Sequence, residues 1–305
     1  MKVLVTGASG FLGGYLLAEL RRRDHLVIAP SSCDCNLREP GALFASVRDP
    51  IDRIYHLAAW TQAGSFCDRR RGEQWIINEQ INANVLAYWH AAQPQAKLIA
   101  FGTSAAYAPG WETREGNYFA AEPSDSYYAY AQAKRSLAVG LQSLARQFQY
   151  RFVYLVPSTL YGPGYRLDGR ELHFIYDLIR KILDGKQSGT PVSLFGDGEQ
   201  TRELVHARDA ACWACDLAER DGAGNEIINL GAGAASTIRE FAGMICAVVG
   251  YPPGQIRYDP TRSVGVRHKL LSVEKLNRLL PERAATPLAR GLAETIAWMR
   301  QPAGI

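Results

Sequence analysis

The chain has 305 residues, 47% of them hydrophobic and 21% charged, a composition that suits one large globular domain or two that share an interface. Its formal charge of +4 is small, and basic residues are spread out apart from Arg21–Arg23 and Arg69–Arg71, so we expect no nucleic-acid partner. We interpret both runs as solvated, with an anionic substrate at Arg69–Arg71 as the alternative. No uninterrupted apolar run reaches membrane-spanning length, so we expect a cytoplasmic protein without a membrane partner.

The cysteines argue for a reduced protein without a metal site. Cys33 and Cys35 stand two apart and Cys212 and Cys215 three apart, but no second Cys or His pair follows at the spacing of a zinc site. Cys212 and Cys215 fall in a helical pattern, where cysteine serves as a small core residue. We therefore predict no metal ligands.

The start of the chain predicts a dinucleotide-binding loop. An apolar run over residues 2–6 reads as a buried parallel strand, and a helix is expected from about residue 11 to 23. Between them glycines repeat at every third position, which permits a tight turn and brings backbone amides close to a pyrophosphate. The expected contacts of the cofactor here are Gly7, Ser9, Gly10, Phe11, Leu12 and Gly13.

The expected second strand, residues 25–29, bears on the choice of cofactor. An acidic residue at its end would bind the ribose 2′-hydroxyl of NAD, but the chain continues with Pro30, Ser31 and Ser32. The two serine hydroxyls can bond a 2′-phosphate, and no carboxylate stands there to repel one. This favours NADP(H), with NAD(H) as the alternative, since no arginine is seen at that strand end.

A third expected strand, residues 54–57, ends in small residues that suit a backbone lying against a cofactor, and Leu57, Ala58 and Ala59 are assigned to that contact. A short helix over about 40–47 precedes it, and a long helix over about 74–93 follows it. The next strand, 97–101, delivers Thr103. Strand ends of this kind border the cofactor crevice in a doubly wound sheet.

The stretch 126–134 opens another amphipathic helix, with Ser124, Asp125 or Ser126 as its expected cap. Tyr130 and Lys134 lie four residues apart and therefore on one helix face. An ammonium beside a phenol favours the phenolate and lowers the phenol pKa, which makes tyrosine a usable general acid and base. Thr103 is expected to place its hydroxyl near the phenol.

With these motifs in order, the sequence resembles the extended short-chain dehydrogenase/reductase family of nucleotide-sugar epimerases, dehydratases and reductases. The segments Leu155–Gly164, Gly196–Glu203 and Asn229–Gly233 resemble further family segments, and the resemblance covers nearly the whole chain. The segments 172–181, 202–206 and 267–271 are most similar to the GDP-fucose synthase branch. This implies a Rossmann-type doubly wound α/β fold, a cofactor domain at about 1–158, and an interleaved C-terminal α/β lobe at about 159–305 that binds substrate.

The resemblance implies roles for individual residues. Tyr130, Lys134, Thr103 and His173 would be catalytic, although a histidine between Leu172 and Phe174 on a helix also fits a structural role. Pro157 would join the cofactor contacts. The implied contacts of a nucleotide-sugar substrate are Thr103, Ser104, Thr159, His173, Lys181, Arg202, Arg267 and Lys269.

Two departures from the family pattern carry information. Fucose synthases have a proton-transferring cysteine two residues after the position of Thr103, and this chain has Ala105 there. The family's substrate-binding asparagine is Thr159 here. Dehydratases place an Asp-Glu pair where this chain has Ser104 and Ala105, so dehydration is not expected.

These features favour a reductase that uses NADP(H) to reduce a nucleotide-activated 4-keto-6-deoxy sugar, with a GDP-linked one expected first. One alternative is a redox-neutral epimerase with tightly bound NAD. Another is a cofactor-sensing protein without catalysis, which an intact Tyr130 and Lys134 argue against. A homodimer formed through the helices near 74–93 and 126–148 is expected from the resemblance.

Overall fold

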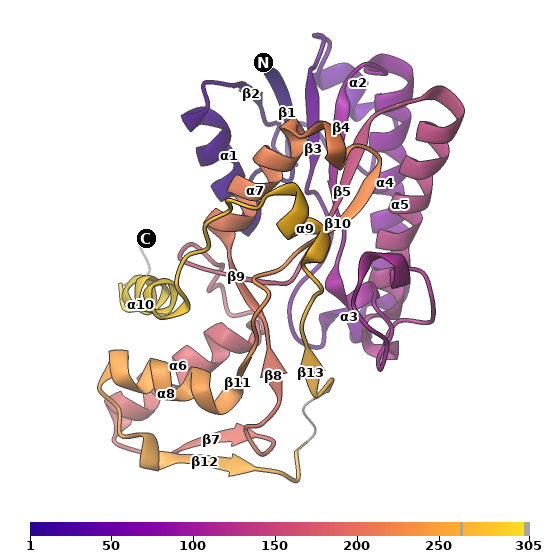
Figure 1. Ribbon diagram of the computed structural model, residues 1–305. Coiled ribbons are helices and arrows are strands. Elements are labelled where there is room, and N and C mark those ends of the chain that lie inside the picture. The colour runs from indigo at the N-terminus through magenta and orange to yellow at the C-terminus, as the bar shows by residue number, and fades with distance from the viewer. Residues whose placement is uncertain (263–264, 302–305) are drawn as a thin grey trace.

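The structure is a computed structural model that describes residues 1–262 and 265–301. Its main sheet has six parallel strands in the order β10-β5-β4-β3-β1-β2 (Figure 1). The strands are β1 (Lys2–Thr6), β2 (Leu26–Ile28), β3 (Arg53–His56), β4 (Lys97–Phe101), β5 (Phe152–Pro157) and β10 (Glu226–Leu230). The predicted doubly wound α/β fold is confirmed. From β1 the chain adds β2 on one side and then β3, β4 and β5 on the other. Such folds bind their ligands at this switch point, between β1 and β3.

Helices cover both faces of this sheet, and its strands are accordingly apolar along most of their length. The helices α4 and α5 pack on one face, while α1 and α7 pack on the other (Figure 1). The helices of this part are α1 (Phe11–Arg22), α2 (Ala42–Ser46), α3 (Phe66–Arg69), α4 (Arg71–Ala92), α5 (Tyr128–Phe148), α7 (Ala207–Glu219) and α9 (Glu274–Leu279). Short 3₁₀ turns are η1 (Ser104–Ala106), η2 (Glu115–Asn117), η3 (Asp125–Tyr127) and η4 (Asp221–Ala223).

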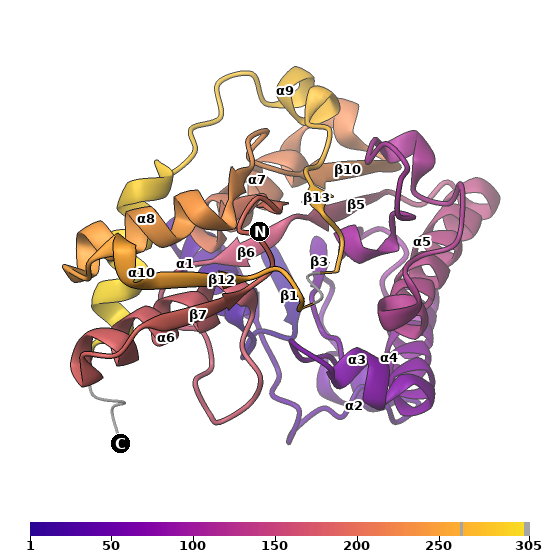
Figure 2. The ribbon, with the colours of Figure 1, turned by 90° about the horizontal axis from the view of Figure 1, so that it is seen from below.

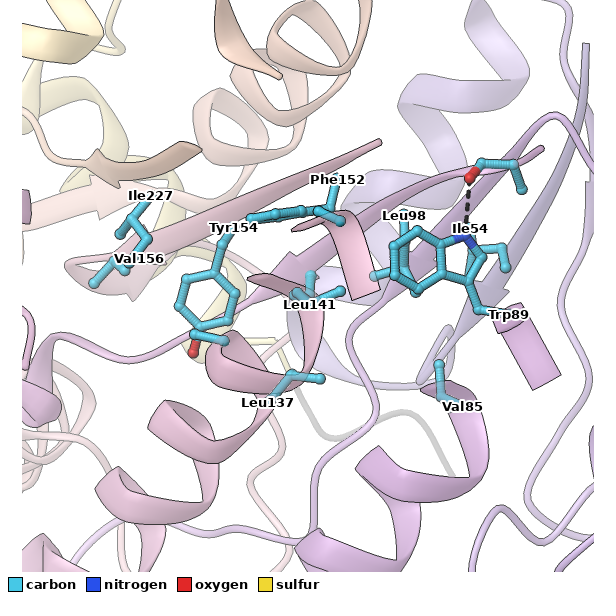
Figure 3. Packing of buried hydrophobic residues seen from close by; sticks show 14 of the residues in the cluster. Ile54, Val85, Trp89, Leu98, Leu137, Leu141, Phe152, Tyr154, Val156 and Ile227 are labelled. Atoms are coloured by element: carbon cyan, nitrogen blue, oxygen red, sulfur yellow. Dashed lines mark hydrogen bonds between the residues drawn. The ribbon is translucent and has the colours of Figure 1, made fainter. Parts of the chain in front are cut away.

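The core under α4 and α5 fixes the helix that carries the predicted catalytic pair. Leu137 and Leu141 of α5 and Trp89 of α4 are fully or almost fully buried against the sheet (Figure 3). The Trp89 indole N–H donates to the carbonyl oxygen of Ala96 at 2.9 Å, so the polar atom of this large side chain is satisfied. The position of α5 relative to the strand ends is therefore set by close packing.

The second part of the chain forms a smaller lobe with its own core around Ile179, Phe241 and Leu292. Figure 2 shows this lobe on one side and α4 and α5 on the other, with β1 and β3 between them. Its helices are α6 (Phe174–Ser188), α8 (Ile238–Val249) and α10 (Leu288–Met299), with the 3₁₀ turn η5 (Pro253–Gln255). Its strands are β6 (Thr159–Tyr161), β7 (Val192–Phe195), β8 (Thr201–Arg202), β9 (Leu204–His206), β11 (Ser236–Thr237), β12 (Ile256–Asp259) and β13 (His268–Lys269).

The ends of two helices differ from the sequence expectation. The first turn of α5 follows directly on η3, and Tyr127 occupies its N-cap position without a side-chain cap among the residues described. The expected caps Ser124, Asp125 and Ser126 were wrong because the chain enters through this 3₁₀ turn, and the Asp125 carboxylate pairs with Arg71 instead. Helix α6 begins at Phe174, which leaves His173 at its N-cap rather than inside it.

The arginines of the basic run 69–71 lie at the surface, as the interpretation of a solvated run expects. Each of its arginines lies within 4 Å of a carboxylate: Arg69 of Glu171, Arg70 of Glu73, and Arg71 of Asp68 and Asp125. Over the described part of the chain, no helix is both long and apolar enough to cross a membrane.

Candidate active site

The glycine loop between β1 and α1 packs closely against the end of β3 and against the first turn of α1. Gly7 has a φ of +73°, and a Cβ there would lie 2.6 Å from the amide nitrogen of Ala58, while a Cβ on Gly13 would lie 2.4 Å from the Gly7 carbonyl oxygen. Gly10 is the N-cap of α1 and has no side chain to occupy the first-turn amides. These residues fit the pyrophosphate of a dinucleotide at the positive end of the helix.

Side chains at the start of α1 serve packing and leave their amides to the cofactor. The Phe11 ring meets Tyr15 and Tyr165 edge to face, with centroids 5.6 and 5.5 Å apart. Leu12 packs into the core between α1 and α7. The Ser9 carbonyl oxygen accepts a hydrogen bond from Arg166 at 3.3 Å. The loop is thus tied to the smaller lobe as well as to the sheet.

The end of β3 is joined to the end of β1 by hydrogen bonds. The Leu57 amide donates to the Thr6 carbonyl oxygen at 3.1 Å, and the Ala58 amide points to the Thr6 hydroxyl at 3.4 Å. Ala58 and Ala59 are partly exposed beside Gly7. The predicted contacts Leu57, Ala58 and Ala59 therefore lie at the point where the sheet reverses its winding.

The segment after β2 holds a carboxylate that sequence reasoning missed. The Ser31 hydroxyl donates to Asp34 Oδ2 at 2.6 Å and accepts from the amides of Cys33 and Asp34. The expectation that no carboxylate stands near this strand end was wrong, because the loop folds Asp34 back onto Ser31. Its distance of about 20 residues from Gly13 is the spacing at which dinucleotide folds place a ribose-binding acid, and that signal was available. Ser32 is exposed.

Tyr130, Lys134 and Thr103 come together at the carboxyl edge of the sheet. The Lys134 ammonium is buried and donates to the Phe101 carbonyl oxygen at 2.7 Å. The Thr103 hydroxyl is a hydrogen-bond partner of the Tyr130 phenol and also accepts the Ala105 amide at 3.2 Å. Thr103 follows the end of strand β4 as the N-cap of η1, and helix α5 carries the other two residues.

Burial dominates the protonation of this group. It raises the pKa of Tyr130 well above its ordinary value, against the lowering effect of the Thr103 hydroxyl, and it lowers the pKa of Lys134 to about 8. The expected lowering of the phenol pKa by Lys134 is not found, because the ammonium is directed to a main-chain carbonyl. Tyr130 is therefore a neutral phenol across the physiological range and is ready to donate a proton.

Two buried tyrosines that the sequence analysis did not single out support this group. The Thr103 amide points to the Tyr118 hydroxyl at 3.5 Å, which lies 3.1 Å from the Tyr154 hydroxyl. Tyr154 in turn donates to the Lys134 carbonyl oxygen at 2.6 Å. This chain of hydroxyls links the strand end to the helix. Tyr154 had a signal, since a phenol in an all-buried strand needs a partner, but Tyr118 lies in an irregular segment without a pattern.

On the smaller lobe, parallel pairing of β8 with β13 places Arg202 directly opposite Lys269. Burial and the charge of Arg202 lower the pKa of Lys269 to about 8. Burial of the imidazole and, to a smaller extent, the charge of Lys269 lower the pKa of His173 to about 4. Arg202 also lowers the pKa of Tyr127, which burial raises, so the guanidinium lies near the start of α5. Arg202 thus lies on the side of the smaller lobe that is closest to the helix of Tyr130.

Other predicted substrate contacts have side-chain partners of their own, although the Arg267 carbonyl oxygen accepts a hydrogen bond from Arg202 at 3.5 Å. The Arg267 guanidinium binds Asp197 at 3.0 Å, and the Lys181 ammonium binds Asp177 at 2.7 Å and lies 5.1 Å from the centre of the Phe195 ring. Ser104 is buried in η1, and Ala105 beside it carries no titratable group. Pro157 ends β5 and Thr159 begins β6, both partly exposed.

The cysteines and histidines show no metal cluster in the part of the chain that the structure describes. Cys215 is a buried core residue of α7, as predicted, while Cys212 is partly buried there. Cys67 is buried in α3, and its thiol influences the pKa of both Tyr127 and Tyr130. The sequence analysis had no reason to place this cysteine near the phenols, since the contact depends on how α3 packs against α5.

Comparison with known proteins agrees with this geometry. A GDP-L-colitose synthase from Yersinia pseudotuberculosis is 29% identical over 92% of this chain and 91% of its own length. A GDP-L-fucose synthase from Escherichia coli is 29% identical over 97% of this chain and 96% of its own length. A GDP-L-fucose synthetase from Naegleria fowleri, solved with NADP bound, superimposes with a TM-score of 0.86 at 24% identity, covering 98% of this chain and 93% of that chain.

A family match covers residues 3–231, which include the glycine loop, helix α5 and the strands of the smaller lobe up to β9. These are the segments that the motifs had marked as the cofactor and catalytic regions. The chain therefore belongs to the NAD dependent epimerase/dehydratase family, the extended short-chain dehydrogenase/reductases.

Proposed function

We propose that this protein is an NADP(H)-dependent reductase of a nucleotide-activated 4-keto-6-deoxy sugar, with a GDP-linked sugar as the first substrate to test. The observation that carries the proposal is the meeting of Thr103, Tyr130 and Lys134 at the carboxyl edge of the sheet that also carries the glycine loop. Relatives named for GDP-linked sugars across more than nine-tenths of the chain support the substrate class.

When bound along the glycine loop and the ends of β1 and β3, the nicotinamide cofactor supplies a hydride for the carbonyl carbon of the sugar. Tyr130 then donates its phenolic proton to the oxygen that becomes an alkoxide. Thr103 orients the phenol and hydrogen-bonds the same oxygen, which stabilises charge that develops only in the transition state. Lys134 would hold the nicotinamide ribose, and its bond to the Phe101 carbonyl oxygen fixes α5 against the end of β4.

The substrate end of the site is the anion clamp, which we define as Arg202 and Lys269. Two cations on paired strands, with Arg202 near the start of α5, suit the two phosphates of a nucleotide sugar. A sugar held through its pyrophosphate there would extend toward Tyr130. His173, whose imidazole stays neutral near pH 7, is proposed to contact the sugar.

The test is absorbance-monitored oxidation of NADPH with GDP-4-keto-6-deoxymannose, followed by NMR of the product. We expect consumption of NADPH and a 4-hydroxyl product. Absence of consumption together with NAD⁺ found in the purified protein would instead identify the redox-neutral epimerase. Absence of any turnover with tight cofactor binding would identify a sensor.

Epimerisation at the carbons beside the ketone is expected to be weak or absent. Ala105 cannot exchange a proton, so only His173 of the expected acid and base pair remains. The measurement is deuterium incorporation from heavy water at those two carbons during turnover. Rapid incorporation at both would contradict the expectation and would make Cys67, which lies near the Tyr130 phenol, the first residue to replace by serine.

For the cofactor, we propose NADP(H) over NAD(H), and the NADP-bound relative from Naegleria fowleri supports this choice. Asp34 is the feature that works against a 2′-phosphate, since its carboxylate holds the Ser31 hydroxyl. The ratio of kcat/KM for NADPH and NADH decides the matter. Asp34→Ser should shift that ratio toward NADPH, and a wild-type preference for NADH would overturn the proposal.

Homodimer formation through α4 and α5, where Trp75 and Val139 are exposed, is proposed as well and is tested by light scattering.

A further inference from the structure

One buried carboxylate in the smaller lobe has no place in the mechanism above. Glu203 is 1% exposed and lies between β8 and β9, directly after Arg202. Its Oε1 accepts the amide of Gly233 at 2.8 Å, and its Oε2 accepts the amide of Leu271 at 3.1 Å. The amide of Ala232 is a further donor to it. Burial raises the pKa of Glu203, and the main-chain N–H groups oppose that rise because they favour the ionised carboxylate.

These hydrogen bonds join three segments that are distant in sequence. Leu271 is two residues beyond Lys269 of β13, and Gly233 follows the loop at the end of β10. The Glu203 carboxylate is closely packed against the main chain, since a Cβ on Gly231 would lie only 2.7 Å from Glu203 Oε1. The carboxylate therefore continues the pairing of β8 with β13 past the last residue of β13.

The charge of Glu203 also acts on the cations around it. It raises the pKa of Lys269, against the lowering caused by burial and by Arg202, and it raises the pKa of Arg283. Arg202 and Lys269 repel each other across one pair of strands, and burying two such charges without a counter-charge is costly. For Lys269, Glu203 supplies that negative charge.

We propose that Glu203 is the positioning residue of the anion clamp, fixing the strands that carry Arg202 and Lys269 so that the two cations stay side by side for a pyrophosphate, with Lys269 kept charged. It touches neither cofactor nor substrate and acts through those two residues. This inference rests on the proposed function, in which the clamp binds the nucleotide sugar.

The test is calorimetric binding of GDP-mannose, a nucleotide sugar whose phosphates do not titrate near neutral pH, to wild type, Glu203→Gln and Glu203→Asp. In Glu203→Gln an amide NH₂ must face a main-chain N–H, and the negative charge is lost. We expect the Kd of GDP-mannose to rise about tenfold or more. The Kd of NADPH should stay within about twofold, because the glycine loop is untouched.

A pH series separates positioning from a merely structural role. Binding by wild type should weaken above about pH 8, where Lys269 loses its proton, and the charges that face Lys269 are Arg202, Glu203 and His173. Loss of the Glu203 charge lowers the pKa of Lys269, so in Glu203→Gln the weakening should begin at lower pH. Glu203→Asp keeps the charge and should keep the wild-type limit while its Kd rises through altered geometry.

The matched control is Glu240→Gln, which removes a carboxylate that also accepts a main-chain amide, that of Thr237, in the capping box of α8. Its Kd for GDP-mannose should not change. A wild-type Kd and pH limit in Glu203→Gln would overturn the inference, and if that variant does not fold, a wild-type Kd in Glu203→Asp would do so. Because binding is measured without turnover, a protein that binds GDP-mannose but does not oxidise NADPH would contradict the proposed reaction and not the role of Glu203.

Discussion

The two halves of the candidate site are built in different ways. The cofactor half consists of the glycine loop and the strand ends beside it, with Gly7 in contact with Ala58, and each part follows a recognisable local pattern. The substrate half consists of Arg202 and Lys269, which meet only because β8 pairs with β13. The first half can be read from the sequence directly, while the second depends on how distant segments are paired.

The largest expected effect comes from Tyr130→Phe, which removes the proton donor at the point where the two halves meet. A loss in kcat of about 10²- to 10⁴-fold is expected, since general acid catalysis contributes that much. NADPH affinity should be retained, as measured by fluorescence titration. Unchanged turnover would remove Tyr130 from the mechanism.

Gly7→Ala probes the cofactor half. A Cβ at a φ of +73° and 2.6 Å from a main-chain nitrogen has no room, and strain plus overpacking should weaken NADPH binding by about 2–4 kcal/mol. Gly14→Ala is the matched control, because nothing lies within 4 Å of a Cβ there. Equal Kd values for the two variants would show that the loop does not approach the cofactor.

Arg202→Gln probes the substrate half. Loss of a charge-assisted bond to phosphate should weaken binding of the nucleotide sugar by about 1.5–3 kcal/mol. KM should rise accordingly, with kcat changed far less. Arg239→Gln, which removes an exposed guanidinium paired with Glu199 on the same lobe, is the control and should leave KM as it was. A fall in kcat alone would place Arg202 at the reacting carbon and not at the pyrophosphate.

The smallest expected effect is on the pH dependence of kcat. It decides between the lowered Tyr130 pKa expected from the sequence and the raised pKa found in the structure. Burial holds the pKa of Tyr130 above its ordinary value of 10.0, and the phenol must be protonated to donate, so kcat should stay level as pH rises toward 10. An ammonium that governed the phenol would produce a fall at lower pH. The pH profile of kcat under saturating substrates separates the two.

The sequence predicted the fold class, the glycine loop and the helix of Tyr130 because each depends on contacts a few residues apart. It failed at Asp34 and at the cap of α5, where an irregular loop chooses between several polar partners. It also failed on the direction of the phenol pKa, since burial is a property of the folded environment. Tyr118 and Glu203 escaped notice because their partners come from distant segments.

The sixth strand of the main sheet has a consequence for synthesis of the protein. A ribosome completes β5 at Pro157 but does not make β10 until residues 226–230, so β5 remains an unpaired edge while the smaller lobe is translated. Val153 and Leu155, which end up fully buried, are exposed during that interval, and apolar edges of this kind pair with other chains. A fragment that stops after β5 should therefore aggregate, and the nascent sheet should become protease-resistant only once β10 has left the ribosome.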